Sequence, residues 1–415
     1  MSNLQLSEFE AFVGIDWADK KHDVCVQIGD ASERSFHQIG SSPEAIESWL
    51  QELHQRCQGK IAIAVELKQG PIIYALQQFD FVTIFPVEPT TLARYREAFS
   101  LSSAKDDPTD AQYALELMIR YPDKVKPLDL EREQVRTLKR LVESRRKFVQ
   151  DRRRLANRLI CCLKHYYPQL LDLFAHRDTD LFSELILRWP SLQSLKSAHK
   201  RSVRHFFNRR GGPCVPRTDD RIRALYTAKE LTDDWSVLMP HQLEAMALAG
   251  QILHLSKAIR IYDKEIKSLF KTMPDSELFE ALPGAGPCLA PRLLVAFGEK
   301  RERFQSAEEV QQLAGIAPVT QRSGKKCWVH FRWQCSKFVR QSFVEWAEKS
   351  VANSTWACAY YQRLRALGKP HHVAVRALAF KWIRILYRCW KSRTVYDEDH
   401  YVRQLQLRGS PLVTG

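Results

Sequence analysis

The sequence lacks the marks of several protein classes. Its ten cysteines form no Cys-x-x-Cys pair, and no histidine pair stands at zinc-finger spacing from them, so we do not expect a structural zinc site. The longest apolar stretches, such as 61–65, are far too short to cross a bilayer. No basic-then-apolar signal peptide opens the chain, and no internal repeat or low-complexity tract occurs. We therefore expect reduced cysteines, a cytoplasmic location and no membrane partner.

Acidic residues are outnumbered by basic ones. The 415 residues include 63 Lys and Arg against 48 Asp and Glu, which gives a formal net charge of +15. A charge of this size favours a large polyanionic partner, nucleic acid above all. A membrane surface is less favoured, because no basic amphipathic stretch has a clean apolar face. The length is enough for two or three domains with sizeable cores.

The amino-terminal part, residues 1–125, shows alternating strand and helix patterns. A meander of three strands followed by helix–strand repeats predicts a mixed sheet with helices packed against it. The order of elements is typical of a ribonuclease-H-like domain, so we expect an α/β fold of that kind. The expected strands are 12–16, 23–28, 35–39, 61–66 and 81–87, and the expected helices are 43–56, 71–79 and two that start at residues 90 and 108.

The middle of the chain, residues 126–272, is predicted to be a helical coiled-coil region. Apolar residues recur at spacings of three, four or seven between Val135 and Leu163, which predicts one long helix. A second helix at 238–269 could return antiparallel to it. The insertion between them, 170–235, has weak periodicity, and its residues predict no fold.

The carboxy-terminal part is expected to comprise a mostly helical domain at 273–396 and a poorly ordered tail at 397–415. The domain begins with the turn Leu-Pro-Gly-Ala-Gly-Pro at 282–287. This turn is similar to a helix-hairpin-helix turn, in which Gly284 and Gly286 would present backbone N–H groups to a DNA phosphate. An ordinary Gly-Pro turn between helices is the alternative.

Four acidic residues stand where a nuclease with this order of elements would hold metal ions. Asp16 and Glu66 end two apolar runs, and Asp107 and Asp110 open a helix and share one of its faces. Mg²⁺ prefers carboxylate oxygens, and two such ions can activate an attacking oxygen and stabilise a leaving one. The four acids therefore predict magnesium-dependent cutting of nucleic acid.

Each of these acids also has a local explanation. Asp107 precedes Pro108 and could cap the helix. The negative charge of Asp110 in the first turn would then interact favourably with the helix dipole. Glu66 could pair with a nearby lysine, and Asp16 could accept hydrogen bonds from the turn that follows it. All four explanations would have to hold together with the right order of elements. We therefore favour a single metal site.

A polar, basic loop at 317–326 contains a candidate nucleophile, Ser323. Basic residues in and just after the loop could hold phosphates around it: Arg322, Lys325, Lys326, His330 and Arg332. A serine hydroxyl is a weak nucleophile unless a base or a metal ion activates it. Judged from the local residues alone, serine followed by glycine is ordinary turn chemistry, and turn formation is the favoured explanation.

The predicted long helix carries a run of basic residues. Two basic triplets on one helix favour contact with nucleic-acid phosphates over a merely solvated face. Nearby, Tyr166 and Tyr167 could stack on unpaired bases or could pack in a core. The arginines expected to touch nucleic acid are Arg145, Arg146, Arg152, Arg153, Arg154 and Arg158.

Taken in order, several stretches resemble the DEDD transposases of bacterial insertion sequences, the insertion-sequence-110 family. In the first part of the chain they are Val-Gly-Ile-Asp-Trp-Ala-Asp-Lys-Lys-His at 13–22, Val-Glu at 65–66 and Lys-Asp-Asp-Pro-Thr-Asp-Ala at 105–111. In the last part they are the turn at 282–287 and Leu-Ala-Gly-Ile-Ala-Pro at 313–318, which leads to Ser323 and Gly324. The ordered combination is specific, although each stretch alone is not.

The resemblance implies a RuvC-like amino-terminal domain whose four acids, Asp16, Glu66, Asp107 and Asp110, bind Mg²⁺ as the cofactor. It also implies that Ser323 is the nucleophile. The family's members are guided by a bridge RNA, transcribed from the element itself, that pairs with donor and target double-stranded DNA. The chain departs from the family pattern after the serine turn, where Trp-Gln-Cys-Ser-Lys replaces a Gly-Asn pair.

The sequence therefore predicts a bridge-RNA-guided DNA recombinase that moves an insertion sequence in a bacterial cytoplasm, at the nucleoid. Ser323 would form a covalent phosphoserine, which preserves bond energy for rejoining another strand. Strand exchange needs several active sites, so we expect a homodimer or homotetramer assembled through the long helices. By the resemblance, serine and acids come from different subunits. Two alternatives stay open: a RuvC-like structure-selective nuclease that uses water, and a non-catalytic nucleic-acid-binding scaffold.

Overall fold

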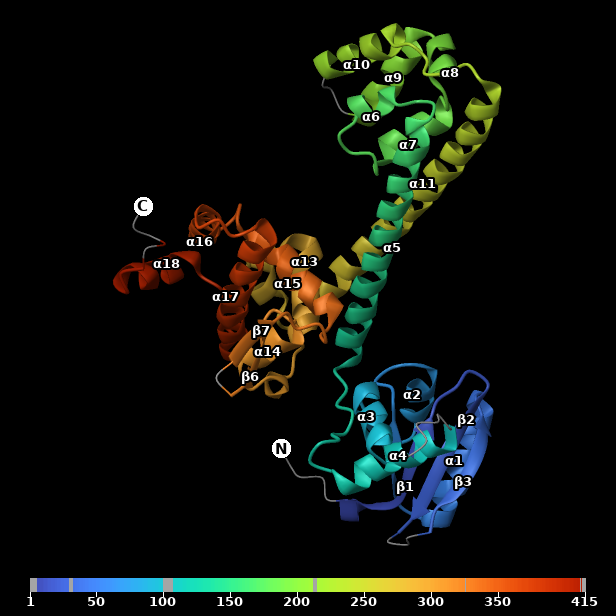
Figure 1. Ribbon diagram of the computed structural model, residues 1–415, viewed down its shortest axis with the longest axis vertical. Helices are drawn as coiled ribbons and strands as arrows, with labels where there is room; N and C mark the ends of the chain where they lie inside the picture. The colour runs from blue at the N-terminus through green and yellow to red at the C-terminus, as the bar shows by residue number, and fades with distance from the viewer. Residues whose placement is uncertain are drawn as a thin grey trace. The chain divides into compact units, whose positions relative to one another are not determined.

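The computed structural model describes residues 6–29, 33–99, 107–211, 215–324, 326–410 and 412 (Figure 1). The chain divides into two compact units, Met1–Leu130 and Glu131–Gly415. Within the described ranges, no helix is both long enough and apolar enough to span a membrane.

A five-stranded mixed sheet forms the centre of the first unit. Its strands are β1 (Phe9–Asp16), β2 (Lys21–Ile28), β3 (Ser35–Gly40), β4 (Lys60–Val65) and β5 (Val82–Pro86). They lie in the order β3-β2-β1-β4-β5. β1 to β3 form an antiparallel meander, whereas β4 is parallel to β1 and to β5. The predicted meander with helix–strand repeats is confirmed.

Helices cover both faces of this sheet. They are η1 (Leu6–Glu8), α1 (Pro43–Cys57), α2 (Pro71–Leu76), α3 (Pro89–Phe99) and α4 (Asp107–Arg120). One core contains Phe12 and residues of α3 and α4, and the other contains Val13, Ile15 and residues of α1 and α2. Successive side chains of a strand point to opposite faces. Gly14 and Asp16 therefore lie on the face that α4 covers.

The second unit is built on two long helices, α5 (Glu133–Lys164) and α11 (Trp235–Lys271), which pack along each other (Figure 1). Arg145 pairs with Asp263, and Arg158, further along α5, pairs with Glu244, which stands earlier in α11. This pairing order means that the helices are antiparallel. The prediction of a long helix and an antiparallel return is thus confirmed.

The insertion between the long helices folds around a core of its own. Its helices are α6 (Gln169–Leu173), α7 (Asp180–Arg188), α8 (Leu192–Ser197), α9 (Lys200–Gly211) and α10 (Val215–Thr227). Phe182 and Phe207 are fully or almost fully buried there, and so are Tyr166 and Tyr167. Burial raises the pKa of both tyrosines above its ordinary value. The two tyrosines are core residues, which excludes base stacking by them in this conformation.

The rest of the second unit is mostly helical, as predicted. Its elements are α12 (Ser276–Glu280), α13 (Gly286–Phe297), η2 (Arg301–Arg303), α14 (Ala307–Leu313), β6 (Val319–Ser323), β7 (Lys326–His330), α15 (Lys337–Ser350), α16 (Thr355–Ala366), α17 (His371–Ser392) and α18 (Glu398–Leu407). We expected a poorly ordered tail at 397–415, and this prediction was wrong for Glu398–Leu407, which form α18. This helix begins with a side-chain cap, because the Asp397 carboxylate accepts a hydrogen bond from the His400 amide at 2.9 Å.

Four buried tryptophans hold this helical region together. Trp346, Trp356, Trp382 and Trp390 are fully buried. Each indole N–H donates a hydrogen bond inside the core, at 2.7 to 3.0 Å. A large apolar ring gains most from burial when its one polar atom keeps a partner. These tryptophans therefore anchor the scaffold that carries the β6–β7 hairpin.

Candidate active site

Asp16 and Glu66 lie at the same edge of the sheet. Asp16 is the last residue of β1, and Glu66 directly follows β4. The two strands are parallel, with Ile15 opposite Val65. Ala62 and Ala64 of β4 belong to the α4-side core, so the alternation that places Asp16 on that face places Glu66 there too. The structure thus brings these two predicted residues together.

α4 lies directly on β1 because Gly14 has no side chain. A β-carbon on Gly14 would lie 1.9 Å from the carbonyl oxygen of Ala111 and 2.8 Å from the amide nitrogen of Leu115. Both atoms belong to the backbone of α4, which cannot move aside alone. The close approach places Asp110, the neighbour of Ala111, against the strand that ends at Asp16.

Asp110 is buried and ion-paired. Asp110 as a whole is 4 % exposed to solvent. Arg96 of α3 donates a hydrogen bond to its Oδ2 at 3.0 Å. A buried carboxylate needs such a partner, and the sequence did not point to Arg96. Asp107 opens α4, but its side chain lies outside the described residues, so its expected roles as ligand or helix cap stay predictions.

A fifth carboxylate, Asp23, was missed by the sequence analysis. It lies directly opposite Asp16 in the antiparallel β1–β2 pair and is 8 % exposed. Cys25, two residues further along β2, belongs to the α4-side core, so Asp23 faces the same side as Asp16 and Glu66. Its Oδ1 accepts a hydrogen bond from the Gln38 amide at 2.8 Å. Only the pairing register shows this neighbour.

Like charges directly opposite each other on two strands destabilise a sheet. Asp16 and Asp23 stand in this arrangement, and Glu66 follows the strand on the other side of β1. A cation near this edge would relieve the repulsion, and carboxylate oxygens are the donors that Mg²⁺ prefers. The donor chemistry at this edge therefore fits a hard divalent cation. Among the side chains that the structure describes, which exclude that of Asp107, no three His, Cys, Asp or Glu residues already form a metal cluster.

His22, beside Asp23, faces the other core and has a structural role. It is 1 % exposed, and its Nδ1 accepts a hydrogen bond from the Ala18 amide at 3.3 Å. Burial lowers the pKa of His22 below its ordinary value, which favours the neutral ring. The hydrogen bond fastens the turn between β1 and β2 and so fixes the hairpin that carries Asp16 and Asp23.

Ser323 ends β6 at the tip of an exposed hairpin in the second unit. It lies opposite Lys326 of β7, and the turn between them contains Gly324 with a φ of +57°. Both strands are largely exposed to solvent. Lys325, another predicted phosphate contact, lies outside the described residues. The hairpin presents Ser323 to solvent rather than burying it in a core.

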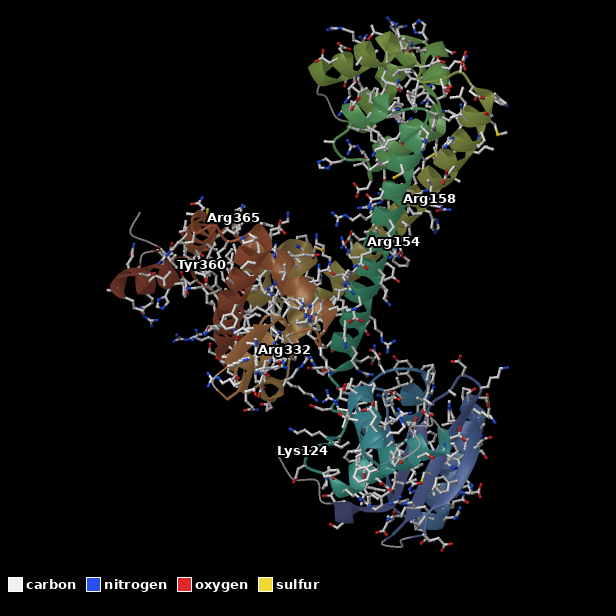
Figure 2. All side chains as sticks on the ribbon, in the orientation of Figure 1. Lys124, Arg154, Arg158, Arg332, Tyr360 and Arg365 are labelled. Atoms are coloured by element: carbon white, nitrogen blue, oxygen red, sulfur yellow. The ribbon has the colours of Figure 1, made fainter. Side chains whose placement is uncertain are left out.

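Strand alternation divides the hairpin residues between two faces. Ser323, Lys326 and Trp328 share one face, because Lys326 is opposite Ser323 and Trp328 is two residues further along β7. Arg322 and Val329 lie on the other face. Arg332, just after β7, turns back to donate a hydrogen bond to the Ala317 carbonyl at 3.3 Å (Figure 2). Of the basic residues expected to hold phosphates, Lys326 and His330 share the face of Ser323, and Lys326 lies directly opposite it.

The glycines of the turn at 282–287 differ in their surroundings. Gly284 has a φ of +73°, and a β-carbon there would lie 2.8 Å from the carbonyl carbon and oxygen of Lys349 in α15. Packing against α15 therefore accounts for this glycine. Gly286 has a φ of +53° and open space beside it. Contact with a DNA phosphate stays a prediction for both glycines, and Gly286 has the more accessible surroundings.

Most of the predicted arginines of α5 have protein partners. Ion pairs join Arg145 to Asp263, Arg152 to Asp178, Arg154 to Asp151 and Arg158 to Glu244. Figure 2 marks the positions of Arg154 and Arg158 on α5. Arg146 donates a hydrogen bond to Gln341 and lies 5.6 Å from the ring of Phe338. Arg153 is exposed. The basic run therefore fastens α5 to its neighbours, and nucleic-acid contact by it stays a prediction.

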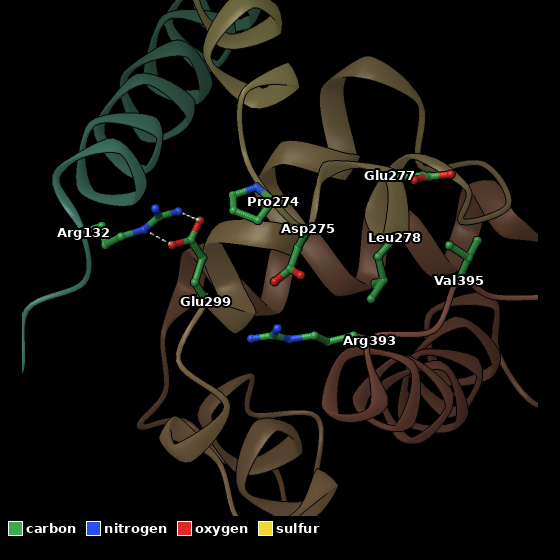
Figure 3. A pocket seen from close by; sticks show the side chains of 8 residues that line it. All are labelled: Arg132, Pro274, Asp275, Glu277, Leu278, Glu299, Arg393 and Val395. Atoms are coloured by element: carbon green, nitrogen blue, oxygen red, sulfur yellow. Dashed lines mark hydrogen bonds and ion pairs between the residues drawn. The ribbon is translucent and has the colours of Figure 1, made fainter.

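A cavity of about 450 Å³ in the second unit is a structural feature rather than part of the site (Figure 3). Arg132 at its wall donates to both carboxylate oxygens of Glu299 at 2.5 Å. Arg301 donates to both oxygens of Asp275, another wall residue, at 2.7 Å. These bidentate pairs account for the charges of Arg132, Asp275 and Glu299 at the wall, and Ser323 does not line the cavity.

Comparison with known proteins relates both parts of this site to one family. A family model described as a transposase of the DEDD IS110 type matches residues 13–168. A second model, described as the transposase IS116/IS110/IS902 family, matches residues 276–362. The chain belongs to the IS110 family of transposases. The first match contains all four predicted acids, and the second contains Ser323 and Gly284. As a transposase, the chain acts on DNA as a recombinase.

Individual relatives agree with this assignment. A Streptomyces coelicolor protein named as a mini-circle transposase for IS117 is 27% identical over 94% of this chain and 95% of its own length. An insertion element IS116 protein of 44.8 kDa from Streptomyces clavuligerus is 25% identical over 95% of this chain and 98% of its own. A pilin gene-inverting protein of Moraxella bovis is 25% identical over 44% of this chain and 61% of its own.

Proposed function

We propose that this IS110-family transposase cuts and rejoins DNA through a covalent phosphoserine at Ser323, with the acids of the first unit serving the same reaction. The observation that carries the proposal is the position of Asp16 and Glu66 at one edge and on one face of the sheet, beneath α4. The strand order and this acid placement support a RuvC-like function of the domain. The exposed position of Ser323 supports its access to a phosphate.

The covalent step balances without an outside reactant. The Ser323 Oγ attacks the scissile phosphorus, a P–Oγ bond forms, and the bond from phosphorus to one deoxyribose oxygen breaks. The serine proton leaves to solvent or to a neighbouring base, and the released DNA hydroxyl takes up a proton. In the second step a hydroxyl of another strand attacks the phosphoserine, which restores Ser323 and reseals DNA. The phosphodiester energy is kept throughout.

Asp16, Glu66, Asp107 and Asp110 are the residues that would hold Mg²⁺. When bound there, Mg²⁺ supplies Lewis-acid polarisation of a phosphate oxygen and favours an ionised attacking hydroxyl. The protein groups have separate tasks. Arg96 orients the Asp110 carboxylate through their 3.0 Å hydrogen bond, and Lys326, opposite Ser323, neutralises charge on the attacked phosphate.

Guidance by a bridge RNA and assembly as a homodimer or homotetramer belong to the same proposal. The net charge of +15 supports a large polyanionic partner. Strand exchange joins two duplexes and so requires more than one active site. The paired helices α5 and α11 offer an extended surface for assembly. Donor and target DNA are then the substrates, and the RNA selects their sequences by base pairing.

The decisive experiment compares Ser323→Ala with Asp16→Ala on DNA that carries the element's junctions, with guide RNA and Mg²⁺ present. We expect both variants to lose strand transfer, and only the unaltered chain to form a covalent protein–DNA adduct on denaturing gels. Retained cutting by Ser323→Ala would favour the water-using nuclease. If the unaltered chain neither cuts nor joins any such DNA, the scaffold alternative is correct.

A further inference from the structure

A groove lined by basic residues lies between α17 and α18 in the second unit. Figure 1 shows where these two helices lie. Its volume is about 970 Å³. The charged residues of its lining are Lys381, Arg384, Arg388, Asp397, His400 and Arg408. Three of the cations stand on α17 at spacings of three and four, which places them on one face of that helix. We call this feature the α17–α18 groove.

The cations of the α17–α18 groove are not neutralised by the protein. Among the residues that the structure describes, no acidic side chain forms an ion pair with Arg384, Arg388 or Arg408. The one carboxylate of the lining, Asp397, accepts the hydrogen bond that caps α18. Like charges at helical spacings of three and four destabilise a helix. This cost persists unless an anion from outside the chain occupies the groove.

Lys381, which lines the groove, has a pKa that burial and its positively charged neighbours lower. Its ammonium lies 4.5 Å from the ring of Tyr360, whose position Figure 2 marks. Burial lowers the pKa of Lys381, and the positive charges of Arg384 and Arg363 lower it further. An entering anion would reverse the electrostatic part of this effect and hold the lysine in its charged form.

The contrast with α5 argues against an ordinary solvated surface. Four of the six α5 arginines predicted to touch nucleic acid form ion pairs, for example Arg145 with Asp263 and Arg158 with Glu244. Most of these arginines are thus paired with carboxylates of the protein. Arg384 and Arg388 are exposed at a concave surface and have no such carboxylates. These two cations are therefore open to an anion from another molecule.

We propose that the α17–α18 groove binds the sugar–phosphate backbone of DNA. A row of guanidinium groups suits phosphate oxygens, which accept bidentate hydrogen bonds. Spacing along one helix face suits successive phosphates of a strand better than a single small anion. DNA is the occupant that the chain's membership of a transposase family supplies. Contacts to backbone phosphates would position DNA without selecting its sequence.

The test measures DNA affinity of the full-length chain across a salt series, without Mg²⁺ so that no cutting intervenes. A fluorescent DNA duplex of arbitrary sequence is the first probe, and a single-stranded RNA of equal length is the second. The test variant is Arg384→Gln with Arg388→Gln. Its matched control is Arg204→Gln with Arg260→Gln, which removes the same charge from arginines that are already ion-paired, with Asp219 and Asp180.

We expect the test variant to bind the duplex more weakly and to lower the slope of log affinity against log salt by about 2, because each lost phosphate contact removes about 0.9. The control should keep a slope close to that of the parent. Because binding needs neither Ser323 nor a metal ion, this result is independent of the proposed phosphoserine chemistry.

Three results would overturn the proposal: an unchanged slope in the test variant, an equal fall in the control, or a loss of affinity for the RNA alone. Circular dichroism checks that both variants are folded. A second measurement avoids substitution altogether. The DNA duplex should protect Arg384 and Arg388 of the unaltered chain from an arginine-specific reagent, and an absence of protection would also contradict DNA binding in the groove.

Discussion

Gly14 of β1 and Ala111 of α4 are in such close approach that a β-carbon on the glycine would lie 1.9 Å from the alanine carbonyl oxygen. This contact joins the strand that ends at Asp16 to the helix that carries Asp110. The geometry of the acid site therefore depends on Gly14, which has no side chain that could take part in the reaction. Changes at Gly14 should affect the site as strongly as changes at an acid.

Gly14→Ala should displace α4 from the sheet. Overpacking of this kind costs about 1–3 kcal/mol of unfolding free energy, and strand transfer should fall further because Asp110 moves with the helix. Thermal denaturation and a strand-transfer assay measure the two effects. Gly250→Ala is the matched control, since a β-carbon there meets nothing within 4 Å. Because Gly250 lies in the interior of α11, this substitution should raise the unfolding free energy by about 0.5–1 kcal/mol. Normal activity of Gly14→Ala would contradict the dependence.

Asp23→Asn should change how the first unit responds to Mg²⁺. Without metal, loss of the charge opposite Asp16 should raise the unfolding free energy by about 0.2–1 kcal/mol. The amide keeps an oxygen that can accept the Gln38 hydrogen bond, so the fold should be preserved. With Mg²⁺ added, the rise in melting temperature should be smaller than for the parent chain.

The control for this experiment is Asp19→Asn, which removes an exposed acid from the turn between β1 and β2. It should leave both the metal-free stability and the Mg²⁺ response nearly unchanged. Equal Mg²⁺ responses in the parent and in Asp23→Asn would show that Asp23 does not contribute to cation binding at this edge.

The placement of basic residues on the two faces of the β6–β7 hairpin predicts which of them contacts the attacked phosphate. Lys326 shares the face of Ser323, whereas Arg322 lies on the opposite face. Lys326→Ala should therefore slow strand transfer by about ten-fold, which corresponds to about 1.4 kcal/mol of activation free energy. Arg322→Ala should have a much smaller effect on the same assay. The reverse order would mean that DNA approaches the hairpin from the other face.

Local sequence patterns were enough to predict the scaffold of the acid site. The apolar runs that end at Asp16 and Glu66 are short and buried, and such runs between turns are typical of central strands. The parallel pairing of β1 and β4 then brings both acids to one edge. Asp23 could not be found in this way, because its importance comes from the register of β2 against β1 rather than from any run or spacing.

Long-range partners explain the other differences between sequence and structure. The arginines of α5 resembled a nucleic-acid surface, but their acids, such as Asp263 and Glu244, lie far along the chain in α11. The insertion at 170–235 gave no pattern because its helices are short, and a short helix shows few turns of periodicity. Its core depends on aromatic residues such as Phe182 and Phe207 that meet only after folding.

Assembly of the active site can be tested by mixing two inactive chains. The acids lie in Met1–Leu130 and Ser323 lies in Glu131–Gly415, and the family resemblance implies that they come from different subunits. A mixture of Asp16→Ala and Ser323→Ala chains should then regain DNA cutting with formation of the covalent adduct, since one site of each mixed dimer combines intact acids with an intact serine. If the chains carry tags of different size, the covalent DNA adduct should appear only on the Asp16→Ala chain, which supplies the serine. If co-assembled mixtures form no adduct, serine and acids must act within one subunit.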